Sequence, residues 1–128
     1  MNYLLDTHTF LWCFEGSDKL SETAKNIIRN ADNQKFISVV SLWEFSIKYG
    51  LGKLKFEGGL PRLLEIITRY NFILLPIKPV YLAAVIELPV IHGDPFDRML
   101  IATALAEDIS IVASDREFRK YKGLRVIW

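Results

Sequence analysis

The segment from His92 to Asp115, HGDPFDRMLIATALAEDISIVASD, constrains the fold more than any other part of the chain. Asp94-Pro95 is typical of a helix start, because Asp94 can cap free backbone N–H groups and Pro95 suits the first helical position. The run 99–106 is apolar almost all round, which predicts a buried helix. Residues 109–113 then have the character of a buried strand that stops beside an acid. A buried helix that leads into a buried strand is half of a βαβ unit, so we expect a parallel sheet.

The rest of the chain continues this alternation of short apolar strands and helices. We expect strands at 2–5, 35–39, 72–75, 109–113 and 125–127. We expect helices at 7–15, 22–31, 41–49, 61–70, 79–87 and from 95 onward, and a helical turn at 116–121. Nearly continuous apolar strands between helices are typical of a sheet that is covered on both faces. The chain is therefore predicted to be a three-layer α/β/α domain over residues 1–128, with a central, mostly parallel sheet of about five strands.

Composition and charge exclude several classes of protein. No apolar run approaches the roughly 18–20 residues of a membrane span, and the first residues lack the cationic region of a signal peptide. The lone Cys13 cannot form an intramolecular disulfide, so we expect a cytoplasmic protein. The segment from Arg116 to Trp128 holds five basic residues against one acid, a net charge of +4 in a chain whose total is +1. This tail is either a solvated helix face or a surface that binds phosphates.

Four acids occupy comparable places in the predicted sheet. Asp6 ends the first strand, and Asp115 follows the strand at 109–113. Glu44 and Asp97 each lie in the first turn of a predicted helix. In an open parallel sheet, the carboxyl ends of the strands and the starts of the following helices share one edge, where ligands of such folds bind. Asp97 joins the other three if its helix starts on that side.

Each of these acids also has an ordinary structural interpretation. Ser41 with Glu44, and Ser114 with Glu117, match the spacing of a capping box. The carboxylate of Asp97 is favoured in a first helical turn by roughly 0.3–1 kcal/mol. Asp6 is a suitable cap for the helix that follows it. Taken singly, each acid is therefore explained by helix capping as well as by ligand binding.

Taken together, the four acids predict a site for a hard divalent cation. Four carboxylates in one cleft repel, and no lysine or arginine adjoins Asp6 or Glu44 in sequence. Mg²⁺ or Mn²⁺ would relieve this repulsion, since both prefer carboxylate oxygens and retain several waters. Such an ion supports hydrolysis of phosphodiester bonds. One cysteine and two histidines, without C-x-x-C or H-E-x-x-H spacing, argue against zinc.

Four motifs in this order, LLDTHTFLW, SLWEFSIKYGLGKL, HGDPFDRMLIATA and IVASDREFRKY, resemble the PIN domain. More narrowly, they are similar to the VapC-type ribonuclease toxins of prokaryotic toxin–antitoxin pairs. The resemblance implies a PIN-like fold and a Mg²⁺- or Mn²⁺-dependent endoribonuclease. In the family's scheme, Asp6, Asp97 and Asp115 hold the metal directly or through water, while Glu44 positions or deprotonates the attacking water.

The resemblance also implies partners and shows one departure. It implies an RNA substrate, a homodimer and a small VapB-type antitoxin that inserts a segment into the active cleft. We expect Lys48, Lys53 and Arg116 to guide RNA phosphates. Many relatives carry Thr or Ser where this chain has Ala113, so the departure concerns a hydroxyl that helps to hold metal-bound water.

Two other classes of function remain open at this stage. One is a PIN-like protein that binds RNA or a partner without cutting, which the departure at Ala113 favours. The other is a receiver-type signalling domain of similar size and α/β order. A receiver domain would need adjacent acids after the first strand and a phosphorylatable aspartate at the end of a middle strand. Asp6 stands alone here and Asp97 opens a helix, which argues against it.

Overall fold

The computed structural model describes residues 1–128. The strands are β1 (Asn2–Leu5), β2 (Gln34–Ser38), β3 (Ile73–Leu75), β4 (Ser110–Val112) and β5 (Val126–Ile127). The helices are α1 (Thr7–Glu15), α2 (Glu22–Arg29), α3 (Val39–Gly50), α4 (Gly59–Arg69), α5 (Pro79–Glu87), α6 (Pro95–Glu107) and the 3₁₀ helix η1 (Arg116–Lys120). None of the helices combines the length and the apolarity that crossing a membrane requires.

The five strands form one sheet in the order β3-β2-β1-β4-β5, and every neighbouring pair is parallel. The chain builds the sheet outward in both directions from β1, with β2 and β3 on one side and β4 and β5 on the other. The order therefore reverses between β1 and β4, which is where open α/β sheets bind their ligands, at the carboxyl ends of the strands. A receiver-type domain instead has the order 2-1-3-4-5, so this topology contradicts that alternative.

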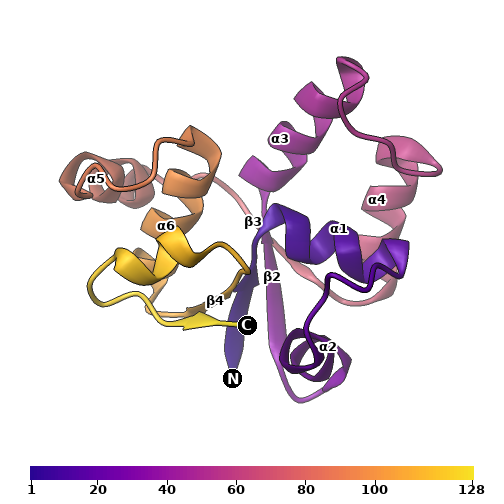
Figure 1. The fold of residues 1–128 in the computed structure, drawn as a ribbon, viewed down its shortest axis with the longest axis horizontal. Helices are drawn as coiled ribbons and strands as arrows, with labels where there is room; N and C mark the ends of the chain where they lie inside the picture. Colours follow the sequence, from indigo (N-terminus) through magenta and orange to yellow (C-terminus); the bar gives the residue numbers. More distant parts are fainter.

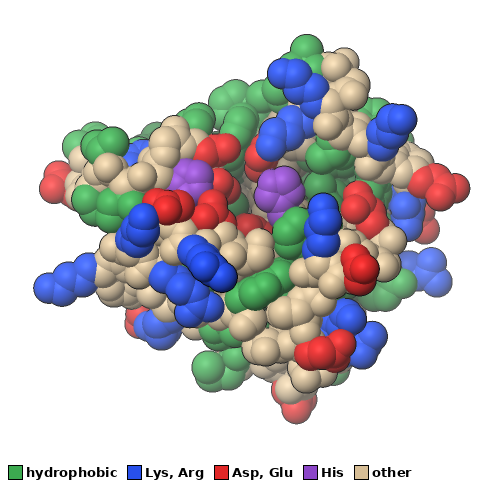
Figure 2. All heavy atoms as spheres, in the orientation of Figure 1, with side chains coloured by type: hydrophobic (Ala, Val, Ile, Leu, Met, Phe, Trp, Pro, Cys, Tyr) green, Lys and Arg blue, Asp and Glu red, His purple; other side chains and the backbone are tan.

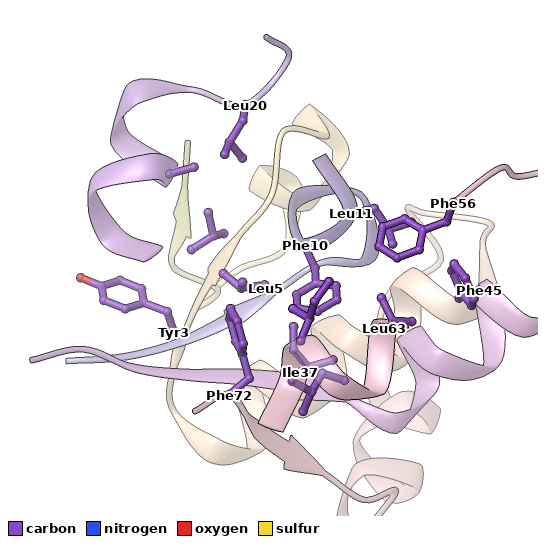
Figure 3. Close-up of a cluster of buried hydrophobic side chains, with 14 residues drawn as sticks. Tyr3, Leu5, Phe10, Leu11, Leu20, Ile37, Phe45, Phe56, Leu63 and Phe72 are labelled. Carbon is purple, nitrogen blue, oxygen red and sulfur yellow. The ribbon is translucent and has the colours of Figure 1, made fainter. Parts of the chain in front are cut away.

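Helices cover both faces of the sheet, which confirms the predicted three-layer α/β/α architecture (Figure 1). Side chains of β1 alternate between two cores, as the period of a strand requires. Tyr3 and Leu5 point into a cluster built with α1, α2, α4 and Phe45 of α3 (Figure 3). Leu4, between them in sequence, packs in a second cluster with residues of α6 and η1. The sheet is thus buried on both faces, and only its edges remain open for a polar site.

Two predicted capping boxes are wrong, and the errors matter for the site. Helix α3 begins at Val39, two residues earlier than predicted, because the hydroxyl of Ser38 caps it by accepting from the Val40 N–H at 3.1 Å. Ser41 therefore lies inside the helix, and Glu44 has no capping role. Likewise Asp115, and not Ser114, caps η1. The predicted caps Asp94 of α6 and Asp6 of α1 are confirmed, and Ser21 caps α2.

Candidate metal centre

Asp6 lies at the point where the strand order reverses. Its backbone N–H donates to the Val112 carbonyl at 3.1 Å, which extends the pairing of β1 with β4 by one residue. Its carboxylate caps α1 by accepting from the Thr9 N–H at 2.7 Å. Only 4% of the residue is exposed. A carboxylate buried this deeply at the carboxyl edge of a sheet has few solvent contacts to offset its charge.

Asp97 and Asp115 meet at the same edge, on either side of a histidine from the loop before α6. The Nε2 atom of His92 lies 3.1 Å from an oxygen of Asp97 and 2.9 Å from an oxygen of Asp115. Asp97 belongs to the first turn of α6, and Asp115 follows β4, so the helix does start on the side of the strand ends. The potential ligand atoms of these three residues all lie within 4.8 Å of one another.

Glu44 projects from the second turn of α3 and is 3% exposed. Its Oε2 atom accepts a hydrogen bond of 2.7 Å from the ammonium of Lys48, one helical turn further on. Its Oε1 atom is buried without any hydrogen-bond partner. Close by, the Thr7 hydroxyl donates to the Ser41 hydroxyl at 2.9 Å and links the start of α1 to the start of α3. Oε1 is therefore a buried acceptor that no donor of the protein satisfies.

The acids act on one another electrostatically. Burial, together with the charges of Asp94, Glu44 and Asp6, raises the pKa of Asp97 from its usual value near 3.8 to about 7, although His92 opposes the shift. Burial likewise raises the pKa of Asp6, against the hydrogen bonds from Thr9, and the charge of Glu44 contributes to the rise. The pKa of Asp115 is lowered: burial acts to raise it, but the hydrogen bonds from Glu117 N–H and His92 prevail. Asp6, Glu44 and Asp97 therefore act on one another electrostatically, and Asp115 joins them through His92, which contacts both Asp97 and Asp115.

A hard divalent cation fits this cluster. Carboxylate oxygens predominate in the donor set, and the orphaned Oε1 of Glu44 is a buried acceptor that lacks a donor. The raised pKa values of Asp6 and Asp97 indicate that the protein alone does not neutralise them. Figure 2 shows acidic and histidine side chains around a hollow near the centre of the view, where α1, α3 and α6 begin in Figure 1.

Comparison with known proteins establishes the family. A family model described as "PIN domain" matches residues 3–124. The chain belongs to the PIN domain family. It is 26% identical over 126 residues to Ribonuclease VapC22 of Mycobacterium tuberculosis, which covers 97% of this chain and 95% of that protein. The predicted resemblance to VapC-type PIN proteins is therefore confirmed.

Solved structures show the same fold for this PIN domain. VapBC2 from Rickettsia felis, bound to a DNA fragment from its promoter, contains a chain that matches with a TM-score of 0.76 at 20% identity, covering 100% of this chain and 99% of that one. VapBC-1 from nontypeable Haemophilus influenzae gives a TM-score of 0.72 at 17% identity, covering 99% and 97%. At these identities the structures support the fold alone.

The three predicted phosphate-binding residues lie in different settings: Lys48 is one helical turn after Glu44, Lys53 lies beyond the C-terminal end of α3, and Arg116 follows Asp115. Lys48 is engaged by Glu44, so a lysine does neutralise that acid, contrary to the expectation from sequence neighbours. Hydrogen bonding to Glu44 raises the pKa of Lys48, despite opposing desolvation, and the charges of Asp94 and Asp97 add to the rise. Lys53 and Arg116 are exposed and form no ion pair.

Some basic residues of the segment 116–128 form ion pairs within the protein. Arg125 pairs with Asp108 at 2.9 Å, and Lys120 pairs with Glu117 at 2.8 Å. Figure 2 nevertheless shows Lys and Arg side chains gathered below the acidic hollow, over the C-terminal segment. Ala113 packs in the second core cluster and offers no polar side-chain atom to the site.

Proposed function

We propose that this protein is a Mg²⁺- or Mn²⁺-dependent endoribonuclease and the toxin of a toxin–antitoxin pair. The observation that carries the proposal is the electrostatic cluster of Asp6, Glu44, Asp97 and Asp115 at the strand-order reversal of a PIN domain. The name of its relative, a ribonuclease, supports RNA as the substrate.

We assign each residue of the cluster a role from its contacts. Asp6, Asp97 and Asp115 would hold the ion. A divalent cation in such a site neutralises charge on the phosphate oxygens and favours deprotonation of a water. Glu44 has one oxygen fixed by Lys48 and one oxygen without a partner, so it is suited to accept a proton from the attacking water. This partly buried ion pair favours an orienting role for Lys48 over binding to phosphate.

Exposed cations around the hollow would bind the RNA backbone. Lys53 and Arg116 keep this role, since neither is paired within the protein. Because such contacts release counterions, affinity for RNA should fall as salt concentration rises. A binding affinity that does not change with salt would contradict this assignment.

We also propose an antitoxin partner and a homodimer. The antitoxin is supported by the structural relatives, several of which are VapBC complexes.

The homodimer is supported by exposed apolar side chains on α3 and α5. They lie beside a groove of about 450 Å³ that α3, α5 and α6 share. Trp43, Val80 and Ile86 are 58%, 56% and 81% exposed. Light scattering that gives a mass of 14.8 kDa for the isolated protein would contradict the homodimer.

The function is tested by sequencing RNA 5′ ends from cells that express the wild type or Asp6→Asn. Asparagine is also a good helix cap, so the variant should keep α1 while it loses the charge. We expect new RNA ends at defined positions with the wild type and none with the variant. A PIN-like protein that only binds RNA, the remaining alternative, would produce the same ends in both cultures, and that outcome would overturn the nuclease proposal.

A further inference from the structure

His92 is the best-anchored polar side chain of the cluster, although it lies in the loop between α5 and α6. Its backbone N–H donates to the hydroxyl of Tyr121 at 2.8 Å, and its ring meets Phe118 edge-on at 5.6 Å between centroids. Tyr121 and Phe118 are both buried in the second core cluster. The core of the domain therefore fixes both the backbone and the imidazole of this residue.

Hydrogen bonding also fixes where the ring carries its proton. The backbone N–H of Asp94 donates to Nδ1 of His92 at 3.1 Å, so Nδ1 is an acceptor and carries no proton. The ring proton then lies on Nε2. This atom is 2.9 Å from Asp115 Oδ2 and 3.1 Å from Asp97 Oδ2, within hydrogen-bonding distance of both. The Nε2–H group thus hydrogen-bonds to Asp115 and lies 3.1 Å from an oxygen of Asp97, so it contacts carboxylates from two different elements.

The same geometry argues against His92 as a metal ligand, although its ring atom belongs to the group within 4.8 Å. A ligand nitrogen must present a lone pair, so coordination through Nε2 would move the proton to Nδ1. There it would face the N–H of Asp94 at 3.1 Å, and two donors would oppose each other. Asp97 Oδ1, by contrast, makes no hydrogen bond and remains available to an ion.

We propose that His92 is a positioning residue that holds Asp97 and Asp115 together for the cation through its Nε2–H, without binding the cation itself. The inference rests on the proposed function for the identity of the cation site. Without the bridge, two repelling carboxylates on α6 and after β4 would separate, and binding would have to reassemble them. Partners of this kind around metal ligands typically contribute about 10–100-fold in affinity.

Two substitutions of His92, with side chains of similar length, test the contact of Nε2–H with the two carboxylates. His92→Gln keeps an N–H near the position of Nε2, whereas His92→Met has similar reach and no donor. Binding of Mn²⁺ is followed by the loss of the free-ion signal in electron paramagnetic resonance. We expect His92→Met to weaken binding by about tenfold or more and His92→Gln to stay within about threefold of the wild type. Equal affinities for both variants, with native circular dichroism, would overturn the proposal.

A nitrogen-15 NMR measurement separates positioning from coordination. The chain has two histidines, so the His92→Gln spectrum assigns the remaining ring signals to His8. In the metal-free protein, we expect His92 to show the pattern of a proton on Nε2, unchanged when Mg²⁺ is added. Loss of that proton on addition of Mg²⁺ would make His92 a ligand and overturn the proposal. Normal metal binding and the expected tautomer in a protein that cuts no RNA would instead refute the proposed function alone.

Discussion

Replacing Asp97 with asparagine is expected to slow Mg²⁺-dependent cleavage of RNA by roughly 10³-fold or more. Asparagine has nearly the same shape, and Asp94 still caps the helix by accepting from the N–H groups of residues 96 and 97. The loss therefore reports on charge. A metal ligand contributes several kcal/mol to stabilisation of the transition state. Each loss of about 1.4 kcal/mol lowers the rate tenfold.

The measurement is a single-turnover cleavage assay of purified protein on RNA, with and without excess EDTA. Asp108→Asn is a matched control, because Asp108 ends the same helix at its far end with a side chain that is 86% exposed. Its φ of 52° suits asparagine as well as aspartate. The control should cleave like the wild type. Cleavage by Asp97→Asn at the control's rate would remove Asp97 from the site.

In the metal-free protein, Asp97→Asn is expected to be more stable than the wild type at pH 8, by about 2–4 kcal/mol. Burial, with the charges of Asp94, Glu44 and Asp6, raises the pKa of Asp97 to about 7 in the folded protein. Between the unfolded pKa of about 3.9 and this value, the folded state binds more protons than the unfolded state. The wild type therefore loses stability as pH rises through this window, and the variant does not.

The difference in free energy of unfolding between the two proteins removes the contribution of titrating groups that do not interact with Asp97. It should be smallest at pH 4, grow up to pH 7 and then level off in urea titrations with EDTA present. Saturating Mg²⁺ at pH 8 should reduce or reverse it, since the ion binds the folded wild type. A difference that does not vary with pH would show that Asp97 is not held in a destabilising environment.

Much of the fold is predictable because its signals are local. Asp94-Pro95 marks a helix start by itself, because the aspartate side chain caps the helix and the proline suits its first position, and this cap is confirmed. The five apolar strands are also found within a few residues of their predicted positions. The sequence cannot give the strand order directly, since pairing of β1 with β4 joins residues that lie more than a hundred positions apart.

The site is less predictable than the fold, because some local sequence patterns match a capping motif that the structure does not form. The capping-box spacing of Ser41 and Glu44 is coincidental: Ser38 starts α3, and Glu44 turns inward instead. The pairing of Glu44 with Lys48 was readable from their spacing of four on a helix, but a search among immediate neighbours misses it. The contact of His92 with Asp115 cannot be inferred from local spacing, because the two residues meet only through the tertiary fold.

The central claim is that carboxylates from three parts of the chain share one divalent cation at the edge of the sheet. Anomalous X-ray diffraction from crystals of the protein grown with Mn²⁺ tests it most directly. We predict an anomalous peak bounded by Asp6, Asp97 and Asp115 in the wild type, and its loss in Asp97→Asn. Manganese bound only elsewhere on the protein, or no peak at a concentration that supports RNA cleavage, would contradict the claim.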